Sequence, residues 1–156
     1  MRAVVQRTKK ASVGVNGKIV STIGKGFLVL LGVFTDDTEE QALDMAIKIS
    51  KLRVMDDNSG KLNLNISDVG GEILSVSQFT LAASTHEGNR PGFSSAARGP
   101  VARGIWEKFN EKLRDIGISV KEGVFGADME VELINDGPVT FVIDMERKDI
   151  AKQGSF

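Results

Sequence analysis

Residues 11–21 read ASVGVNGKIVS, and this stretch predicts the first folded unit of the chain, a β-hairpin. Asn16-Gly17 at its centre is the strongest short hairpin signal, because both residues tolerate the positive φ of a two-residue turn. The GKG of residues 24–26 then leads into FLVLLGV, residues 27–33. That run is apolar at nearly every position, which is typical of a strand buried on both faces. We therefore expect the first 35 residues to form β-structure.

Two helices are predicted further along the chain. Residues 38–41 fit a capping box, in which the Thr38 oxygen and the Gln41 side chain satisfy free N–H groups of the first turn. Behind it, apolar residues recur at helical spacing, at Ala42, Met45, Ile49 and Leu52. The second helix is predicted from Pro100 to Ile116, with Gly117 as its stop. Its apolar stripe comprises Ile105, Phe109, Leu113 and Ile116.

Strand-like runs return at residues 118–120, 131–134 and 139–144. The NDGP of residues 135–138 lies between the last two runs and favours a hairpin turn, because each of these residue types prefers turns. The chain has no repeat and no linker long enough to divide it into domains. We predict a single α+β domain of mainly antiparallel strands with two principal helices.

Composition narrows the class of protein. The 156 residues are 41% hydrophobic and 26% charged, as in ordinary globular domains. No apolar run approaches the roughly 20 residues that span a bilayer, and Arg7, Lys9 and Lys10 interrupt any signal-peptide core. The chain has no cysteine, which excludes disulfides and thiolate chemistry, and no cluster of residues at metal-ligand spacing. We expect a cytoplasmic protein without a metal, an organic cofactor or a membrane contact.

The formal net charge of −1 limits how a nucleic acid could be bound. Proteins that hold long stretches of nucleic acid usually carry a basic stripe and a high isoelectric point. An RNA partner of this chain would therefore be contacted over a small part, such as an acceptor end.

The SQFTL of residues 77–81 ends an apolar run and is the first candidate site. Hydroxyl groups at a strand end often bond only to local backbone. Alternatively, donors from Ser77 to Thr80 stabilise a developing oxyanion, or Thr80 is a nucleophile. A nucleophilic hydroxyl needs a base, and the one histidine of the chain is His86, six residues further on.

SQFTL and the NDGPVT of residues 135–140 together resemble the two signature motifs of the D-aminoacyl-tRNA deacylases, which are small homodimeric proofreading enzymes. MRAVVQR (1–7), GNRP (88–91) and FGADM (125–129) are similar to the same family, in the same order. The resemblance covers about residues 1–145. Residues 146–156 depart from the family pattern and form a C-terminal tail in this interpretation.

The resemblance implies a homodimer that hydrolyses the ester between a D-amino acid, or glycine, and the terminal ribose of tRNA. Ser77, Gln78, Phe79 and Thr80 would form the catalytic segment, and the neighbouring RNA 2′-hydroxyl would assist. The Gly137-Pro138 bond would be cis, and its neighbouring carbonyl groups would reject an L-amino acid in the partner subunit's pocket. Arg7 would donate hydrogen bonds to this loop, whereas its simpler interpretation is a solvated strand-edge charge.

The same resemblance assigns Phe125, Gly126 and Ala127 to a pocket for the terminal adenosine, although a plain glycine turn before a strand explains them as well. Two other functions remain open on sequence grounds. One is an esterase for small esters that uses Thr80 and His86. The other is a non-catalytic dimeric module that binds adenosine-like ligands.

Overall fold

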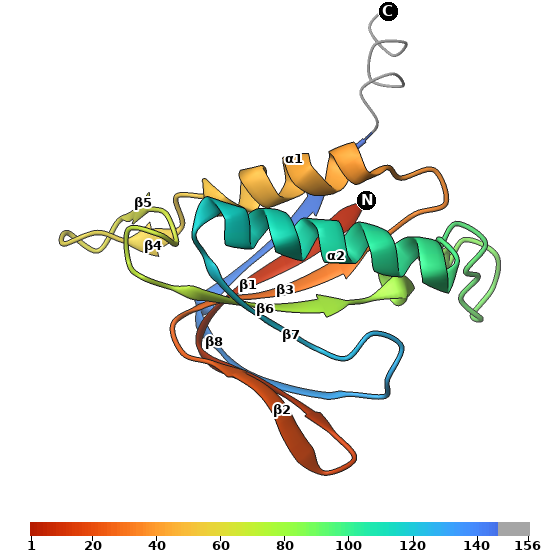
Figure 1. Ribbon diagram of the computed structural model, residues 1–156, viewed down its shortest axis with the longest axis horizontal. Coiled ribbons are helices and arrows are strands. Elements are labelled where there is room, and N and C mark those ends of the chain that lie inside the picture. The colour runs from red at the N-terminus through yellow and green to blue at the C-terminus, as the bar shows by residue number, and fades with distance from the viewer. Residues whose placement is uncertain (147–156) are drawn as a thin grey trace, which may run out of the picture.

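A long β-hairpin forms the centre of the computed structural model, which describes residues 1–146 (Figure 1). Strand β1 (Arg2–Val15) pairs antiparallel with β2 (Lys18–Ile23) and β3 (Gly26–Gly32). Strands β2 and β3 together form the second arm of the hairpin. Ala11 lies opposite Ile23 on β2 and Thr8 lies opposite Gly26 on β3, so the register is the same for both strands. The turn residues Asn16 and Gly17 have φ values of 51° and 75°, which confirms the predicted hairpin.

The rest of the sheet is mixed. Strand β6 (Glu72–Ser77) lies parallel to β3, and β7 (Ser119–Glu122) lies parallel to β6. The expectation of mainly antiparallel strands is confirmed, because every partner of β1 pairs with it antiparallel. The parallel β3–β6 and β6–β7 pairs were not predicted. A helix precedes β6 and another precedes β7 along the chain, and such crossovers are how parallel neighbours are connected. A separate small sheet pairs β4 (Met55–Asp56) with β5 (Leu62–Leu64).

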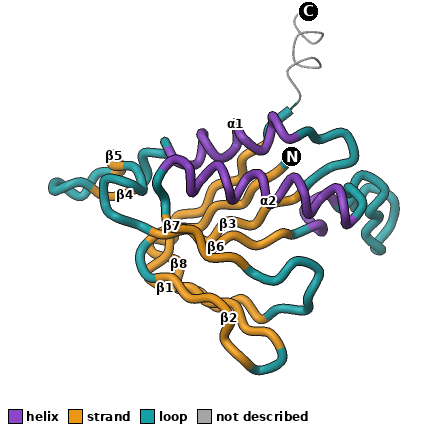
Figure 2. Tube along the Cα trace, in the orientation of Figure 1, coloured by secondary structure: helices purple, strands orange, loops and turns teal. Residues whose placement is uncertain are grey.

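Helices α1 (Glu39–Ser50) and α2 (Gly99–Ile116) lie side by side across one face of the sheet (Figures 1 and 2). The predicted capping box is present at the start of α1, where the Thr38 amide donates to Gln41 Oε1 over 2.8 Å. Gly117 ends α2 in the left-handed conformation with φ 101°, as predicted. Ile116 was expected in the apolar stripe of α2, but it is 38% exposed, whereas Leu113 is fully buried.

Strand β3 is buried on both faces, as its apolar run predicts. Phe27, Val29 and Leu31 pack beneath the helices in the larger core. Leu28 points to the opposite face and packs in a second core with Ala11, Val13, Ile23, Leu74 and Val76. This second core exists because the sheet curls until β2 approaches β7, where the Ser21 hydroxyl donates to the carbonyl of Glu122. The sheet is therefore nearly barrel-like.

Residues 130–144 differ from the predicted hairpin. They form one strand, β8 (Glu130–Asp144), which runs antiparallel to β1 along its length. Gln6 pairs with Thr140 and Thr8 with Asn135, so residues 136–139 lie opposite Arg7 alone and form a bulge. The turn-favouring residues thus accommodate extra length on one strand without reversing the chain. We refer to these residues as the 136–139 bulge.

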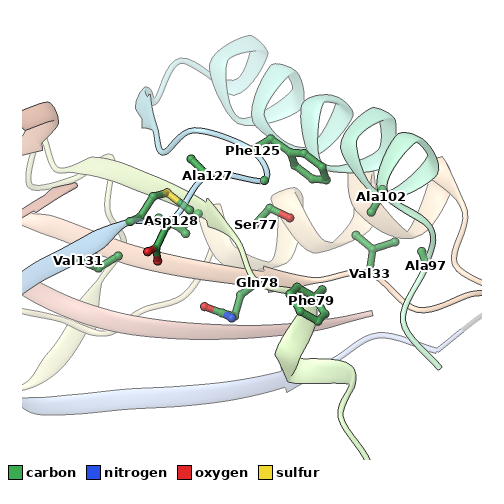
Figure 3. Close-up of a pocket in the computed structure, with 14 residues that line it drawn as sticks. Val33, Ser77, Gln78, Phe79, Ala97, Ala102, Phe125, Ala127, Asp128 and Val131 are labelled. Atoms are coloured by element: carbon green, nitrogen blue, oxygen red, sulfur yellow. The ribbon is translucent and has the colours of Figure 1, made fainter. Parts of the chain in front are cut away.

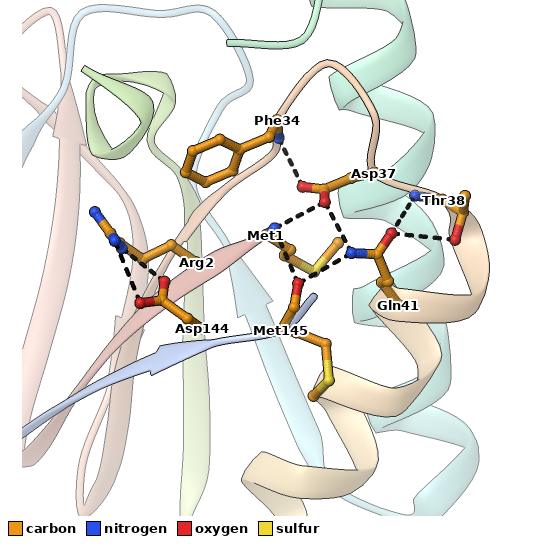
Figure 4. Close-up of polar contacts among 8 residues, drawn as sticks. All are labelled: Met1, Arg2, Phe34, Asp37, Thr38, Gln41, Asp144 and Met145. Carbon is orange, nitrogen blue, oxygen red and sulfur yellow. Dashed lines mark hydrogen bonds and ion pairs between the residues drawn. The ribbon is translucent and has the colours of Figure 1, made fainter. Parts of the chain in front are cut away.

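A polar network joins the N-terminus to the start of α1 and the end of β8 (Figure 4). The Met1 ammonium lies 2.7 Å from Asp37 Oδ1 and also donates to the carbonyl of Met145. Gln41 Nε2 donates to Asp37 and to the same carbonyl, which anchors α1 to the sheet.

Neither described helix is long and apolar enough to cross a membrane. Apart from Glu146, the predicted tail lies outside the described residues.

Candidate active site

A cavity of about 530 Å³ lies where β6 leaves the sheet, beneath the start of α2 (Figure 3). Its walls come from four parts of the chain: the residue after β3, the end of β6, the segment before and into the first turn of α2, and the segment before and into β8. The lining residues are Val33, Val76, Ser77, Gln78, Phe79, Ala97, Gly99, Ala102, Phe125, Gly126, Ala127, Asp128, Met129 and Val131. This volume is within the usual range for small-ligand sites.

Ser77, Gln78 and Phe79, which the sequence singled out as candidate site residues, form one wall of this cavity. Strand β6 is buried up to Val76, and the chain then turns into the short 3₁₀-helix η1 (Phe79–Ala82). The Gln78 amide donates to the carbonyl of Leu31 over 2.8 Å, which ties this turn to β3. In Figure 3 the Ser77 hydroxyl points into the space beneath Phe125 and Ala102.

The close packing of this turn on β3 depends on Gly32. A Cβ atom at Gly32 would stand 2.8 Å from Leu81 Cβ and 3.1 Å from the carbonyl oxygen of Gln78. The absence of a side chain there allows η1 to lie directly against the strand. The position of the Ser77–Phe79 wall is therefore fixed from below by backbone contact.

Thr80 lies outside the set of residues that line the cavity and is exposed on η1. Its hydroxyl accepts a hydrogen bond from Gln78 Nε2. His86 is also exposed, in the segment after η1, and does not line the cavity. The structure therefore does not bring together a Thr80–His86 pair at the cavity wall.

Phe125, Gly126 and Ala127 form the opposite wall, so the two segments that the family resemblance singled out face one cavity. Gly126 turns the chain with φ 75°. The Phe125 ring packs 5.8 Å from the ring of Trp106, and the Arg103 guanidinium stands 5.5 Å above it. Trp106 in turn donates to the buried Ser75 hydroxyl over 2.8 Å, which connects this wall to the middle of β6.

Arg7, Gly137 and Pro138 are not among the residues that line this cavity. Arg7 is only 7% exposed, so the interpretation as a solvated edge charge is wrong. Its Nε donates to the carbonyl of Asp136 over 2.9 Å, which is the contact that the resemblance implied. The Gly137–Pro138 peptide bond is cis.

The 136–139 bulge is held from two sides. Arg7 binds its first residue, and at its other end the Val139 amide donates to Asn135 Oδ1 over 3.0 Å. Gly137 has φ 143°, and a Cβ atom there would lie 2.6 Å from Val139 Cγ2. Any other residue would be strained at this position, and both Gly137 and Pro138 are exposed.

Several lining residues were not predicted as site residues, namely Val33, Val76, Ala97, Gly99, Ala102, Asp128, Met129 and Val131. Most are small or apolar and resemble ordinary core or loop residues in a sequence. Asp128 and Met129 follow directly on the predicted FGA segment, and that adjacency is the one signal that could have found them. Within residues 1–146, no group of three or more His, Cys, Asp or Glu side chains could hold a metal ion.

Comparisons with known proteins identify the family of this chain. The family model for D-Tyr-tRNA(Tyr) deacylase matches residues 4–144. A D-aminoacyl-tRNA deacylase of Lacticaseibacillus casei is 53% identical over 95% of this chain and 100% of its own length. Its counterpart from a Geobacillus species is 54% identical over 95% of this chain and 97% of its own length.

Two solved structures share the fold. One, described as a c-Myc DNA unwinding element binding protein, is 43% identical and covers 94% of this chain and 100% of its own, with a TM-score of 0.89. The other, a probable eukaryotic D-amino acid tRNA deacylase, is 17% identical and covers 92% of this chain and 98% of its own, with a TM-score of 0.79. At that identity the second match supports the fold alone. The family model and the relatives above 50% identity establish that the chain belongs to the D-aminoacyl-tRNA deacylase family of ester hydrolases.

Proposed function

We propose that this protein hydrolyses the ester bond of D-aminoacyl-tRNA, and of tRNA wrongly charged with glycine, in the cytoplasm. The observation that carries the proposal is that Ser77, Gln78 and Phe79 on one wall and Phe125 to Ala127 on the other face the same cavity. Family membership supplies the substrate class. Phe79 and Phe125 offer ring faces on which the terminal adenine can stack.

The chemistry is the addition of water to the ester carbonyl carbon. The bond from that carbon to the ribose oxygen breaks, the oxygen takes up a proton, and free amino acid and tRNA leave. The Ser77 hydroxyl and the first N–H groups of η1 are candidate donors to the developing oxyanion, because a helix has no internal acceptors for its first amides. We assign activation of water to the vicinal RNA 2′-hydroxyl, which is already positioned beside the carbonyl.

Chirality is assigned to the 136–139 bulge of a second subunit. The bulge does not line the cavity of its own chain, so its main-chain carbonyl groups act on the substrate only if a partner subunit presents them. Backbone that is fixed by Arg7 and Asn135 cannot rotate away from an L side chain. A D side chain points elsewhere, and glycine has no side chain to reject. This model requires a homodimer.

The first experiment compares deacylation of one tRNA charged with D- and with L-amino acid. We expect turnover of the D form and little turnover of the L form. A tRNA ending in 2′-deoxyadenosine should bind normally but be cleaved very slowly, because loss of an oriented group can raise a barrier by roughly 7 kcal/mol or more. Full activity on the deoxy substrate would return catalysis to the protein, and a His86→Ala variant would then test the esterase alternative.

A mixed dimer tests whether two subunits share each site. One subunit carries Ser77→Ala and the other Gly137→Ala, and two different tags isolate the mixed species. If the bulge acts across the interface, one site has both defects and the other has neither, so about half of the wild-type rate returns with full selectivity. If each chain uses its own bulge, every site has one defect and no site is both fast and selective.

A further inference from the structure

The guanidinium of Arg7 joins two segments that are far apart in the sequence. From the middle of β1, its Nε donates to the carbonyl of Asp136, at the start of the 136–139 bulge. Its Nη1 donates to the carbonyl of Val54 over 2.9 Å and to Asp56 Oδ1 over 3.1 Å. The Arg7 side chain is 8% exposed, so these partners replace most of its contact with water.

We propose that Asp56, on β4, is a positioning residue for the 136–139 bulge and acts through Arg7. A guanidinium is planar and presents its N–H donors in a rigid fork. Two acceptors on one side of the fork, the Val54 carbonyl and Asp56, therefore fix the direction of the Nε–H bond on the other side. That direction determines where the Asp136 carbonyl, and with it the start of the bulge, comes to rest.

Asp56 is suited to this role because the hairpin that carries it is itself rigid. Met55 is fully buried in the larger core, and it pairs with Leu64 on β5. The adjoining turn is closed by Asp57, whose Oδ1 accepts from Ser59 and from the Lys61 amide. Among the described strands, β4 and β5 pair only with each other, so Arg7 provides a direct link between this hairpin and the bulge.

The consequence concerns selectivity more than rate. The Ser77–Phe79 wall is fixed by its own contacts with β3 and does not depend on Arg7. Loss of Asp56 leaves that wall unchanged but lets the Arg7 fork turn, which loosens the Asp136 carbonyl. When D against L discrimination is measured, the inference rests on the proposed function. When the mobility of the bulge is measured, the inference is tested independently of the proposed function.

The test uses Asp56→Ala in the full-length protein, with Asp115→Asn as a control that removes one carboxylate charge from an exposed position near the end of α2. We expect Asp56→Ala to lower the ratio of D to L kcat/KM by about three- to tenfold, the equivalent of about one hydrogen bond. D and L rates are measured on the same preparation, so a change in folded fraction cancels. Hydrogen–deuterium exchange of peptides covering residues 135–140 should be faster in Asp56→Ala and unchanged in the control.

A double-mutant cycle with Arg7→Lys then tests the route. If Asp56 acts through Arg7, adding Asp56→Ala to Arg7→Lys lowers the ratio no further. Unchanged exchange of residues 135–140 in Asp56→Ala would overturn the inference, as would full additivity in the cycle. An inactive wild-type protein would overturn the proposed function instead, and the exchange measurement would still decide the role of Asp56.

Discussion

The Ser77–Phe79 wall and the 136–139 bulge are both short segments at which regular strand pairing stops, yet they are built in different ways. The wall follows a buried strand, points side chains into a cavity, and packs against β3 where Gly32 lacks a side chain. The bulge lies outside that cavity, presents main chain, and is held by the side chains of Arg7 and Asn135. Under the proposed function, we therefore expect chemistry and discrimination to change independently, and the following variants test that separation.

Ser77→Ala should have the largest effect. It removes a hydroxyl that points into the cavity, and loss of one oxyanion donor typically costs about 10²–10³ in rate. The D and L substrates should slow by the same factor, because the bulge is untouched. Single-turnover deacylation of both forms measures this. A changed D to L ratio would show that the wall also reads chirality.

Gly137→Ala should act on the bulge alone. Its φ of 143° and the 2.6 Å approach to Val139 make any side chain strained, at a cost of about 1–3 kcal/mol in the free energy of unfolding. We expect selectivity to fall at least tenfold while cleavage of the D form persists. Urea denaturation and paired D and L assays measure the two effects.

Gly104→Ala is the matched control for that substitution. Gly104 is exposed within α2, and a Cβ atom there meets nothing within 4 Å. Alanine should stabilise the helix by about 0.5–1 kcal/mol without altering either assay. A loss of stability in this control would mean that glycine replacement as such, not the bulge geometry, explains Gly137→Ala.

Thr80→Ala should slow deacylation only a few-fold. Thr80 lies outside the cavity lining, and its hydroxyl accepts a hydrogen bond from the side-chain Nε2 of Gln78. Losing one such hydrogen bond costs about 0.5–1.5 kcal/mol. Mass spectrometry of the wild-type protein quenched during turnover should find no acyl group on Thr80. An acyl-Thr80 adduct would restore the nucleophile hypothesis.

The smallest effect is a pH dependence from the hairpin that carries Asp56. A hydrogen bond from the Ser59 hydroxyl, with others from backbone amides, lowers the pKa of Asp57 to about 2. Between that value and the ordinary aspartate pKa of about 3.9, the unfolded chain binds more protons than the folded one, so stability rises with pH. Asp57→Asn should lower Tm above about pH 4, and the difference from wild type should shrink as pH falls towards about 2. A difference that is constant across this window would contradict the assignment.

Several elements of the fold could be predicted from the sequence because they depend on local interactions. The Asn16-Gly17 turn, the capping box at Thr38 and the Gly117 stop are set by φ preferences and hydrogen bonds within a few residues. The segments 77–79 and 125–127, which line the cavity, were also singled out, because the first ends an apolar run and both match a family pattern.

The tertiary structure alone decided how these pieces meet. Residues 135–138 have every local preference for a hairpin turn, yet pairing with β1 on both sides keeps the chain in one strand and forces a bulge. Without the family resemblance, Arg7 looks like a solvated charge in the sequence, but the structure buries it between β4 and β8, where its donors must find carbonyl groups. Ala97, Gly99 and Ala102 became cavity residues because α2 lies over the end of β6, which no local pattern encodes. Local preference determined the elements, and burial against distant strands determined their partners.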